Sequence, residues 1–298
     1  GSLKEAESSL RKAIQLKPNF TNAYNNLGNI LKDLGNLKEA ELSTRKAIEL
    51  QPDDAMAHSN LGSILKNLGK LKDAEISYHK AIKLNSNFAD AHYNLGCILT
   101  NHGRLEEAEL SFRKAIEIKP DYANAHSNLG LILKDLGKLK EAELLQRKAI
   151  ELNPDYANAH SNLGSILRDL GKSEEAEIYT RKAIKLNPNL AEAHSNLGTI
   201  LIDLGTLEEA EVSTRKAIEL NPSYAMAHSN LGNILRDLGN LKEAEIYTRK
   251  AIEINPNIAI AHSNLGNIFR DIGKNYDAIN IYKEAIKLDS NLSYAKCG

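Results

Sequence analysis

The string Asn-Leu-Gly returns every 34 residues along almost the whole chain, and this period constrains the fold more than any other feature. A repeat of this length is typical of a solenoid, in which each unit buries its apolar face only against its neighbours. If each unit starts five residues before its asparagine, eight repeats are flanked by a partial repeat over residues 1–20 and the start of another over 293–298. The eight repeats fill residues 21–292, with boundaries at 21–54, 55–88, 89–122, 123–156, 157–190, 191–224, 225–258 and 259–292.

Each repeat contains two stretches with the apolar spacing of a helix. In the repeat 123–156, the first stretch includes Leu129 and stops before Gly137, because glycine readily adopts the left-handed conformation that ends helices. The second stretch includes Ala142 and ends before Pro154, because proline disfavours helical geometry in the residue before it. Each repeat is therefore predicted to be a pair of helices, helix A followed by helix B.

A polar residue follows the proline position of every repeat, and we expect it to be the N-cap of the next helix A. A side-chain oxygen at the N-cap accepts a hydrogen bond from the unpaired N–H groups of the first helical turn. The expected N-caps are Asn19, Asp53, Asn87, Asp121, Asp155, Asn189, Ser223, Asn257 and Asn291.

Helix A of every repeat contains a glycine, which is Gly130 in the fourth repeat. A glycine inside a helix costs ~1 kcal/mol relative to alanine, so we expect it to mark a close approach between helix A and helix B. Helix B carries glutamate four residues before arginine or histidine, an orientation that stabilises helices. We expect these pairs to form a solvated outer face at Glu41, Glu75, Glu109, Glu143, Glu177, Glu211 and Glu245.

Charge and composition argue against several classes of function. The chain has 38 Lys and Arg against 39 Asp and Glu, so its net charge of −1 provides no basic face for nucleic acid. No apolar stretch approaches the ~20 residues of a membrane helix and no signal peptide opens the chain, so we expect no membrane insertion. Gly1 and Ser2 are interpreted as a cleavage scar. The distant Cys97 and Cys297 favour free thiols in a reducing, cytoplasmic compartment.

Histidine occupies the same place in seven of the repeats, at His58, His92, His126, His160, His194, His228 and His262. Successive histidines are one repeat apart, too far to share a metal ion with bonds of ~2 Å. We expect them to pack against neighbouring side chains, with pH sensing and metal binding as the alternatives. Motifs of nucleotide-binding, zinc-protease and hydrolase sites are absent from the sequence, so it predicts no catalytic residue, cofactor or metal and no enzyme activity.

The repeat resembles the tetratricopeptide repeat family. The family pattern Trp-x2-Leu-Gly-x2-Tyr…Ala-x3-Phe…Pro is present in the fourth repeat as His126, Leu129, Gly130, Leu133, Ala142, Gln146 and Pro154. The resemblance implies an all-α solenoid of antiparallel helix pairs in a right-handed superhelix, with helices A lining a concave groove. The array looks most similar to the asparagine-lined superhelix of O-linked N-acetylglucosamine transferases and to bacterial proteins of the family.

The implied groove is the candidate binding site. An asparagine amide offers a donor and an acceptor, so a row of asparagines is suited to holding the backbone of an extended peptide. A purely structural use of the asparagines is the alternative. The candidate residues are the ladder Asn26, Asn60, Asn94, Asn128, Asn162, Asn196, Asn230 and Asn264, the cations Lys66, Lys134, Arg168, Arg236 and Arg270, and the divergent Tyr93 and Leu131.

The sequence therefore predicts a non-catalytic scaffold whose partner is a protein or an extended peptide segment. One alternative is the substrate-recruiting arm of a larger enzyme, with glycosyltransferases suggested by the resemblance alone. A second alternative is end-to-end self-association, because repeats cut at both ends of the chain expose apolar faces that terminal repeats normally cover.

Overall fold

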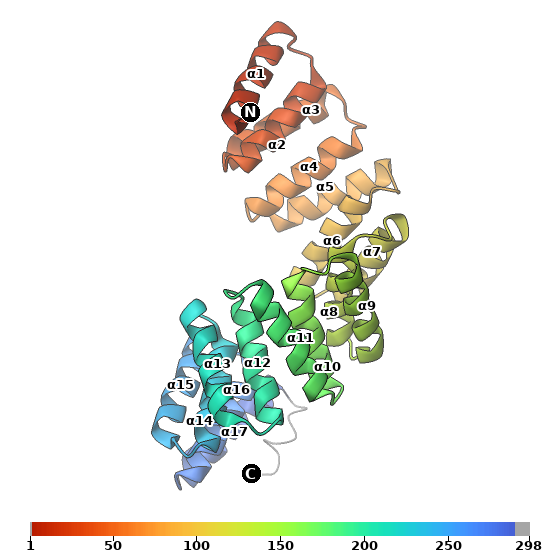
Figure 1. The fold of residues 1–298 in the computed structure, drawn as a ribbon. Helices are drawn as coiled ribbons and strands as arrows, with labels where there is room; N and C mark the ends of the chain where they lie inside the picture. Colours follow the sequence, from red (N-terminus) through yellow and green to blue (C-terminus); the bar gives the residue numbers. More distant parts are fainter. Residues whose placement is uncertain (1, 290–298) are drawn as a thin grey trace. The chain divides into compact units, whose positions relative to one another are not determined.

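The computed structural model describes residues 2–289, in which there are seventeen helices and no strand (Figure 1). The predicted all-α solenoid of helix pairs is confirmed. Helices A are α2 (Thr21–Asp33), α4 (Ala55–Asn67), α6 (Ala89–Asn101), α8 (Ala123–Asp135), α10 (Ala157–Asp169), α12 (Ala191–Asp203), α14 (Ala225–Asp237) and α16 (Ala259–Asp271). Helices B are α1 (Leu3–Leu16), α3 (Leu37–Leu50), α5 (Leu71–Leu84), α7 (Leu105–Ile118), α9 (Leu139–Leu152), α11 (Ser173–Leu186), α13 (Leu207–Leu220), α15 (Leu241–Ile254) and α17 (Asn275–Leu288).

The chain divides into two compact units, Gly1–Lys138 with α1 to α8 and Leu139–Gly298 with α9 to α17. Within each unit, every helix packs against the next one along the chain, and successive helices A also contact one another. Successive helices B are bridged by long charged side chains, as between Arg181 of α11 and Glu209 of α13. Each unit therefore has one face made of helices A and another made of helices B.

The ends of helices A follow the prediction from glycine. The glycine after each helix A has a φ between +71° and +81°, a left-handed conformation that L side chains rarely adopt. After α2, the N–H of Gly35 donates to the Lys32 carbonyl at 3.0 Å, and the N–H of Asn36 donates to the Leu31 carbonyl at 2.8 Å. These two bonds satisfy carbonyls that the helix itself leaves unpaired.

The predicted N-caps are wrong by one residue. The N-cap of each helix A is the following residue, which is aromatic or aliphatic except at Asp54, whose Oδ1 accepts from the N–H of Met56 at 2.9 Å. The predicted residues instead belong to the preceding turn. There, for example, the N–H of Asn189 donates to Oδ1 of Asn187 at 3.1 Å. The asparagine at the end of helix B thus organises this turn. Asn291, the last predicted N-cap, lies outside the described residues.

The core is shared between consecutive helices. Leu163 and Leu167 of α10 form one buried cluster with Ala176 of α11 and Ile200 of α12. Glycine allows the close approach that the sequence predicts, because a Cβ on Gly164 would lie 3.0 Å from the Ala176 carbonyl oxygen. That distance is inside normal contact, so α10 and α11 can pack this closely only because residue 164 has no side chain.

Gly1 of the predicted cleavage scar, the predicted start of a further repeat over 293–298, and Cys297 all lie outside the described residues. Ser2, the other residue of the predicted scar, is the N-cap of α1, where its side chain accepts from the N–H of Glu5. The partial repeat over 1–20 provides α1, the helix B that packs against α2.

Candidate functional site

Three asparagines of the second unit form hydrogen bonds from one helix A to the previous helix A. The Nδ2 of Asn196 donates to Oγ of Ser161 at 3.1 Å, and Nδ2 of Asn230 donates to Oγ of Ser195 at 3.3 Å. Asn264, which is buried, repeats the pattern with Ser229. Asparagine and serine thus alternate as donor and acceptor along the helix-A face. A structural role, the alternative to ligand binding, therefore uses one N–H of each of these amides.

The first unit follows the same pattern with different acceptors. Nδ2 of Asn60 donates to Oδ1 of Asn25 at 2.8 Å, and Nδ2 of Asn128 donates to the Tyr93 hydroxyl at 3.2 Å. Asn94 departs from the pattern, because its Nδ2 bonds to the Asp90 carbonyl in its own helix. The remaining candidates of the row are the exposed Asn26 and the half-buried Asn162.

The amide oxygens of the row are mostly left available. Within the described residues, Oδ1 of Asn60, Asn196 and Asn230 accepts no hydrogen bond, whereas Oδ1 of Asn94 accepts one from Lys66 at 3.3 Å. The side chains that keep a free oxygen are half-buried. Each therefore presents an acceptor whose direction is fixed by the bond that its own N–H makes to the preceding repeat.

Three of the five candidate cations pair with carboxylates on the same face, whereas Lys66 bonds to the Asn94 amide. Arg168 bonds to Asp203 of the next helix A at 2.9 Å, and Arg236 bonds to Asp237 at 2.6 Å. Arg270 bonds to Asp271 at 3.2 Å, and Lys134 is half-buried. The charges of the three arginines are therefore neutralised in pairs.

The divergent third repeat contains an aromatic cluster. The Tyr93 ring lies 4.8 Å from the Tyr122 ring and 5.8 Å from the Phe112 ring, measured between centroids. Burial raises the pKa of the Tyr122 hydroxyl, and the neighbouring Asp90 carboxylate raises it further. Tyr93 is thus packed within its unit, and its hydroxyl accepts the hydrogen bond from Asn128. The other divergent candidate, Leu131, is half-buried.

The histidine row has a role that sequence reasoning missed. In each of the seven repeats, Nε2 of the histidine bonds to the backbone carbonyl six residues earlier at 2.8–3.0 Å, as between His160 and Pro154. His160 also stacks on Tyr179 of helix B, with ring centroids 5.9 Å apart. Histidine thus fastens helix A to the turn before it. Each histidine lies six residues after the proline position of its turn, and this spacing in the sequence could have predicted the contact.

The glutamates predicted to form a solvated face are half-buried instead. Their side chains are only 13–29% exposed. Glu143 accepts from Arg147 as predicted, and also from Lys172 of the next repeat at 2.9 Å. The hydrogen bond from Lys172, followed by that from Arg147, holds the pKa of the Glu143 carboxyl below its usual value. Lys172, which comes from the next repeat, covers this carboxylate. A prediction made from one repeat alone therefore placed the carboxylate in solvent.

Helices B carry a feature that the sequence analysis did not use. One aliphatic residue at the same place in seven consecutive helices B is 65–69% exposed, namely Leu42, Ile76, Leu110, Leu144, Ile178, Val212 and Ile246. The 34-residue spacing of these exposed aliphatic residues is visible in the sequence. An aliphatic residue that recurs at this spacing among charged neighbours could therefore have predicted an exposed apolar row on helices B.

Two kinds of site are not found in residues 2–289. No group of three or more His, Cys, Asp or Glu side chains has the arrangement of a metal site. None of the helices there combines the length and the apolar character that a crossing of the bilayer demands.

Comparison with known proteins identifies the repeat. Tetratricopeptide repeat profiles match residues 21–54, 55–88, 78–109, 98–137, 121–189, 179–212, 225–258 and 259–292. No curated protein sequence matches the chain.

Many solved structures are similar to the chain, including the following three. YrrB, described as "a TPR protein with an unusual peptide-binding site", is 28% identical with a TM-score of 0.51, covering 62% of this chain and 95% of YrrB. The Cut9–Hcn1 hetero-tetramer of the APC/C is 17% identical with a TM-score of 0.73, over 99% of this chain and 58% of that one. PilF of Pseudomonas aeruginosa is 21% identical with a TM-score of 0.57, over 70% and 95% of the two chains.

Proposed function

This chain belongs to the tetratricopeptide repeat family, and we propose from that premise that it is a non-catalytic scaffold for protein interactions. Its partner is an extended segment of another protein, held on the helix-A face. The observation that carries this proposal is the row of fixed amide oxygens, exemplified by Asn196 and Asn230. A peptide backbone supplies the N–H donors that such acceptors need.

The arrangement favours recognition of backbone over recognition of side-chain charge. An acceptor held in place loses little conformational entropy when a ligand binds, so its hydrogen bond contributes more to the affinity. The arginines of the same face are paired with carboxylates, as Arg168 is with Asp203. The face therefore selects an extended conformation and gives little preference for ligand charge.

The comparison with YrrB supports a peptide as the ligand class. YrrB is described as having a peptide-binding site, and it is 28% identical to this chain, of which the match covers 62%.

The proposal is tested by selecting ligands and then separating the two uses of asparagine. Random unstructured 12-residue peptides displayed on phage are selected on the chain, and the affinity of the binders is measured by fluorescence polarisation. The double variant Asn196→Ala with Asn230→Ala removes both the inter-repeat bonds and the free oxygens. The double variant Ser161→Ala with Ser195→Ala removes only the inter-repeat bonds.

The expected result is a loss of affinity of about tenfold for the asparagine variant, the effect of about one or two net hydrogen bonds. The serine variant is expected to lose less affinity for a similar loss of thermal stability. Asn189→Ala, in an exposed turn, is the control and should bind normally. Equal losses in the asparagine and serine variants would show that the asparagines act only through the stability of the fold.

End-to-end self-association is a second candidate because of the exposure of α1. None of its fourteen residues is buried, and Leu16 is 80% exposed while Leu3 is 43% exposed. If this surface mediates association, sedimentation velocity will show mass increasing with concentration. Leu16→Glu will then suppress the increase, whereas an unchanged increase in that variant would exclude α1 as the contact.

A further inference from the structure

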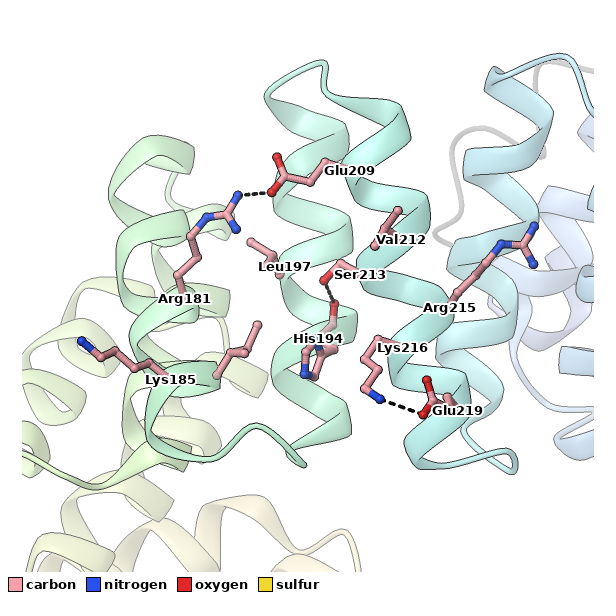
Figure 2. Close-up of a pocket in the computed structure, with 11 residues that line it drawn as sticks. Arg181, Lys185, His194, Leu197, Glu209, Val212, Ser213, Arg215, Lys216 and Glu219 are labelled. Atoms are coloured by element: carbon pink, nitrogen blue, oxygen red, sulfur yellow. Dashed lines mark hydrogen bonds and ion pairs between the residues drawn. The ribbon is translucent and has the colours of Figure 1, made fainter.

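A cleft of about 680 Å³ opens between two successive helices B of the second unit, α11 and α13 (Figure 2). Ile184 of α11, Leu197 of α12 and Val212 of α13 provide its apolar lining. Its volume lies in the range of ligand sites, which is about 300–1,000 Å³. The neighbouring gaps between helices B show what kind of side chain fits such a space.

In the gap between α9 and α11, the chain places a tyrosine of its own. The ring of Tyr179 stacks on His160 with centroids 5.9 Å apart. The guanidinium of Arg147, which comes from α9, lies 5.5 Å from the centre of the same ring. Nη1 of Arg147 donates to the tyrosine hydroxyl at 3.0 Å. A histidine on helix A and an arginine on the preceding helix B therefore hold the tyrosine from two sides.

The same arrangement recurs in the gap between α13 and α15. Tyr247 stacks on His228 with ring centroids 5.8 Å apart, and the Arg215 guanidinium lies 5.4 Å from the tyrosine ring. Nη1 of Arg215 donates to the hydroxyl at 3.0 Å, while its Nη2 bonds to Glu243 of α15 at 2.8 Å. The bond to glutamate holds the arginine across the gap.

The cleft between α11 and α13 has every part of this arrangement except the ring. The tyrosine position is Ser213, a much smaller residue, whose hydroxyl donates to the His194 carbonyl at 3.1 Å. Figure 2 shows Arg181 of α11 bonded to Glu209 of α13, so the guanidinium is held across the opening. Nη1 of Arg181, the atom that would donate to a tyrosine hydroxyl, makes no hydrogen bond to any described residue.

The histidine of this cleft is uncovered as a result. His194 is half-buried, whereas His160 and His228, which lie under tyrosines, are both 5% exposed. The fourth gap of the second unit, between α15 and α17, has Ile281 at the tyrosine position. Within this unit, a small residue therefore leaves only the gap between α11 and α13 open.

The first unit contains a similar cleft of about 540 Å³ between α3 and α5, with Ser77 at the tyrosine position. Its glutamate position is Asp73, which is one methylene group shorter. Arg45 bonds to Glu41 of its own helix and, within the described residues, makes no bond across the cleft. This cleft therefore has the space but not the arginine held across it.

The two remaining gaps of the first unit each lack one of the groups that would hold a ring. Between α1 and α3, Ser43 is at the tyrosine position, but Tyr24 replaces the histidine. Between α5 and α7, Ser111 is at the tyrosine position, but His79 replaces the arginine. Only the gap between α11 and α13 therefore combines the serine with the histidine, arginine and glutamate of the filled gaps.

We propose that the cleft between α11 and α13 binds a tyrosine side chain of a partner protein. The ring stacks on His194 below the Arg181 guanidinium, and the hydroxyl accepts from Nη1 of Arg181, as in the gaps filled by Tyr179 and Tyr247. A buried tyrosine removes about 150–250 Å² from water, and the arginine adds a cation–π attraction. None of these residues belongs to the asparagine row, so the cleft is a second binding surface.

The test is a titration followed by the ¹³C methyl signals of Ile, Leu and Val residues. The probe is the uncharged peptide acetyl-Gly-Ser-Tyr-Ser-Gly-amide, compared with versions that have phenylalanine or leucine in place of tyrosine. Saturable shifts are expected at Leu197 and Val212. The phenylalanine peptide should bind about fivefold more weakly, because it lacks the hydroxyl, and the leucine peptide at least tenfold more weakly. The equivalent Leu61 and Ile76 of the first unit should shift much less in the same spectra.

Two substitutions of the same serine give the matched comparison. Ser213→Tyr supplies the missing ring within the chain and should abolish the shifts caused by the peptide. Ser213→Ala removes only the hydroxyl and should bind as the parent does. Arg181→Met keeps an unbranched apolar side chain but no donor, so it should give the tyrosine and phenylalanine peptides the same affinity. Thermal unfolding curves will show that each variant is folded.

A gain of binding is expected from Tyr247→Ser, which opens the equivalent gap between α13 and α15. New saturable shifts should then appear at Leu231 and Ile246, which are the counterparts of Leu197 and Val212.

Three results would overturn the proposal. The first is unchanged binding in Ser213→Tyr, and the second is equal shifts in the clefts of the two units. The third is equal affinity for the tyrosine and leucine peptides, which would reduce the cleft to a general apolar surface.

Discussion

Replacing Gly164 by alanine tests how closely helices A and B approach each other. A Cβ at this position would lie 3.0 Å from the Ala176 carbonyl oxygen and closer still to Oγ1 of Thr180. Thr180 is fully buried and donates to the Ala176 carbonyl at 2.8 Å, so neither atom is free to move away. Forcing a methyl group into such a contact costs ~1–3 kcal/mol. The better helix propensity of alanine returns ~1 kcal/mol, so a net loss of ~1 kcal/mol is expected.

The cause of this loss is separated by a double-mutant cycle with Thr180→Ala. That substitution removes Oγ1 and leaves space that the new methyl group fills, so the double variant should be more stable than the sum of the single effects predicts. A coupling of ~1–2 kcal/mol is expected, which is within the range measured for residues in contact.

Gly171→Ala is the control for this cycle. Gly171 has a φ of +75° and no atom within 4 Å of its Cβ position, so its substitution costs ~1–2 kcal/mol through backbone strain alone. That loss should not be relieved by Thr180→Ala. Thermal unfolding followed by circular dichroism is the main assay, with amide hydrogen exchange of α10 and α11 because solenoids unfold locally. A coupling below about 0.5 kcal/mol for Gly164 would refute the close approach.

Two further predictions concern the dependence of stability on pH. The lowered pKa of the Glu143 carboxyl stabilises the fold above its ordinary value of 4.5, and this contribution is lost as the pH falls through the folded-state pKa. The melting temperature of Glu143→Gln should therefore fall less than that of the parent between pH 6 and pH 3, and parallel curves would contradict it. Burial lowers the pKa of His92, so on acidification below about its ordinary value of 6.5 the unfolded chain takes up the proton first. His92→Gln should therefore lose less stability than the parent chain between pH 7 and pH 5. An equal loss in the two chains would show that this histidine is protonated equally in the folded and unfolded states.

The sequence predicts the fold well because each signal lies within one repeat. The period, the helix pairs, the terminal glycines such as Gly35 and the close contact at Gly164 all follow from local spacing. The N-cap prediction fails because two residues of the turn, rather than one, separate the proline position from the helix. An aromatic or aliphatic residue such as Phe20 therefore lies at the cap, where it has no side-chain hydrogen bond.

The candidate site was harder to predict because its geometry depends on contacts between repeats. Sequence reasoning places Asn196 on the helix-A face but cannot show that its amide N–H bonds to Ser161, 35 residues earlier. It likewise assigns Glu143 to solvent, because the covering Lys172 comes from the next repeat. In a solenoid, each side chain has neighbours at a distance of one repeat, so the partner of a residue is found by adding or subtracting about 34 positions.

The fixed spacing of the asparagine oxygens predicts the conformation of the proposed peptide ligand. Packed helices lie about 8–10 Å apart, so acceptors on successive helices A recur at about that interval. A polyproline II segment has three residues per turn with a rise of about 3.1 Å per residue, which repeats every ~9.3 Å. The backbone N–H of every third ligand residue can therefore meet Asn196 and Asn230 in turn, whereas a β-strand repeats on one side every ~6.6 Å and loses register.

This match is tested with N-methylated versions of a selected peptide, in which chosen backbone N–H groups are removed. Three peptides are compared, each methylated at every third residue but starting at successive positions. One register should lose binding and the other two should retain most of it, because only one set of N–H groups faces the asparagines. The Asn196→Ala and Asn230→Ala double variant, already lacking those acceptors, should not distinguish the three peptides. Losses of similar size in all three registers would refute a backbone contact once per repeat.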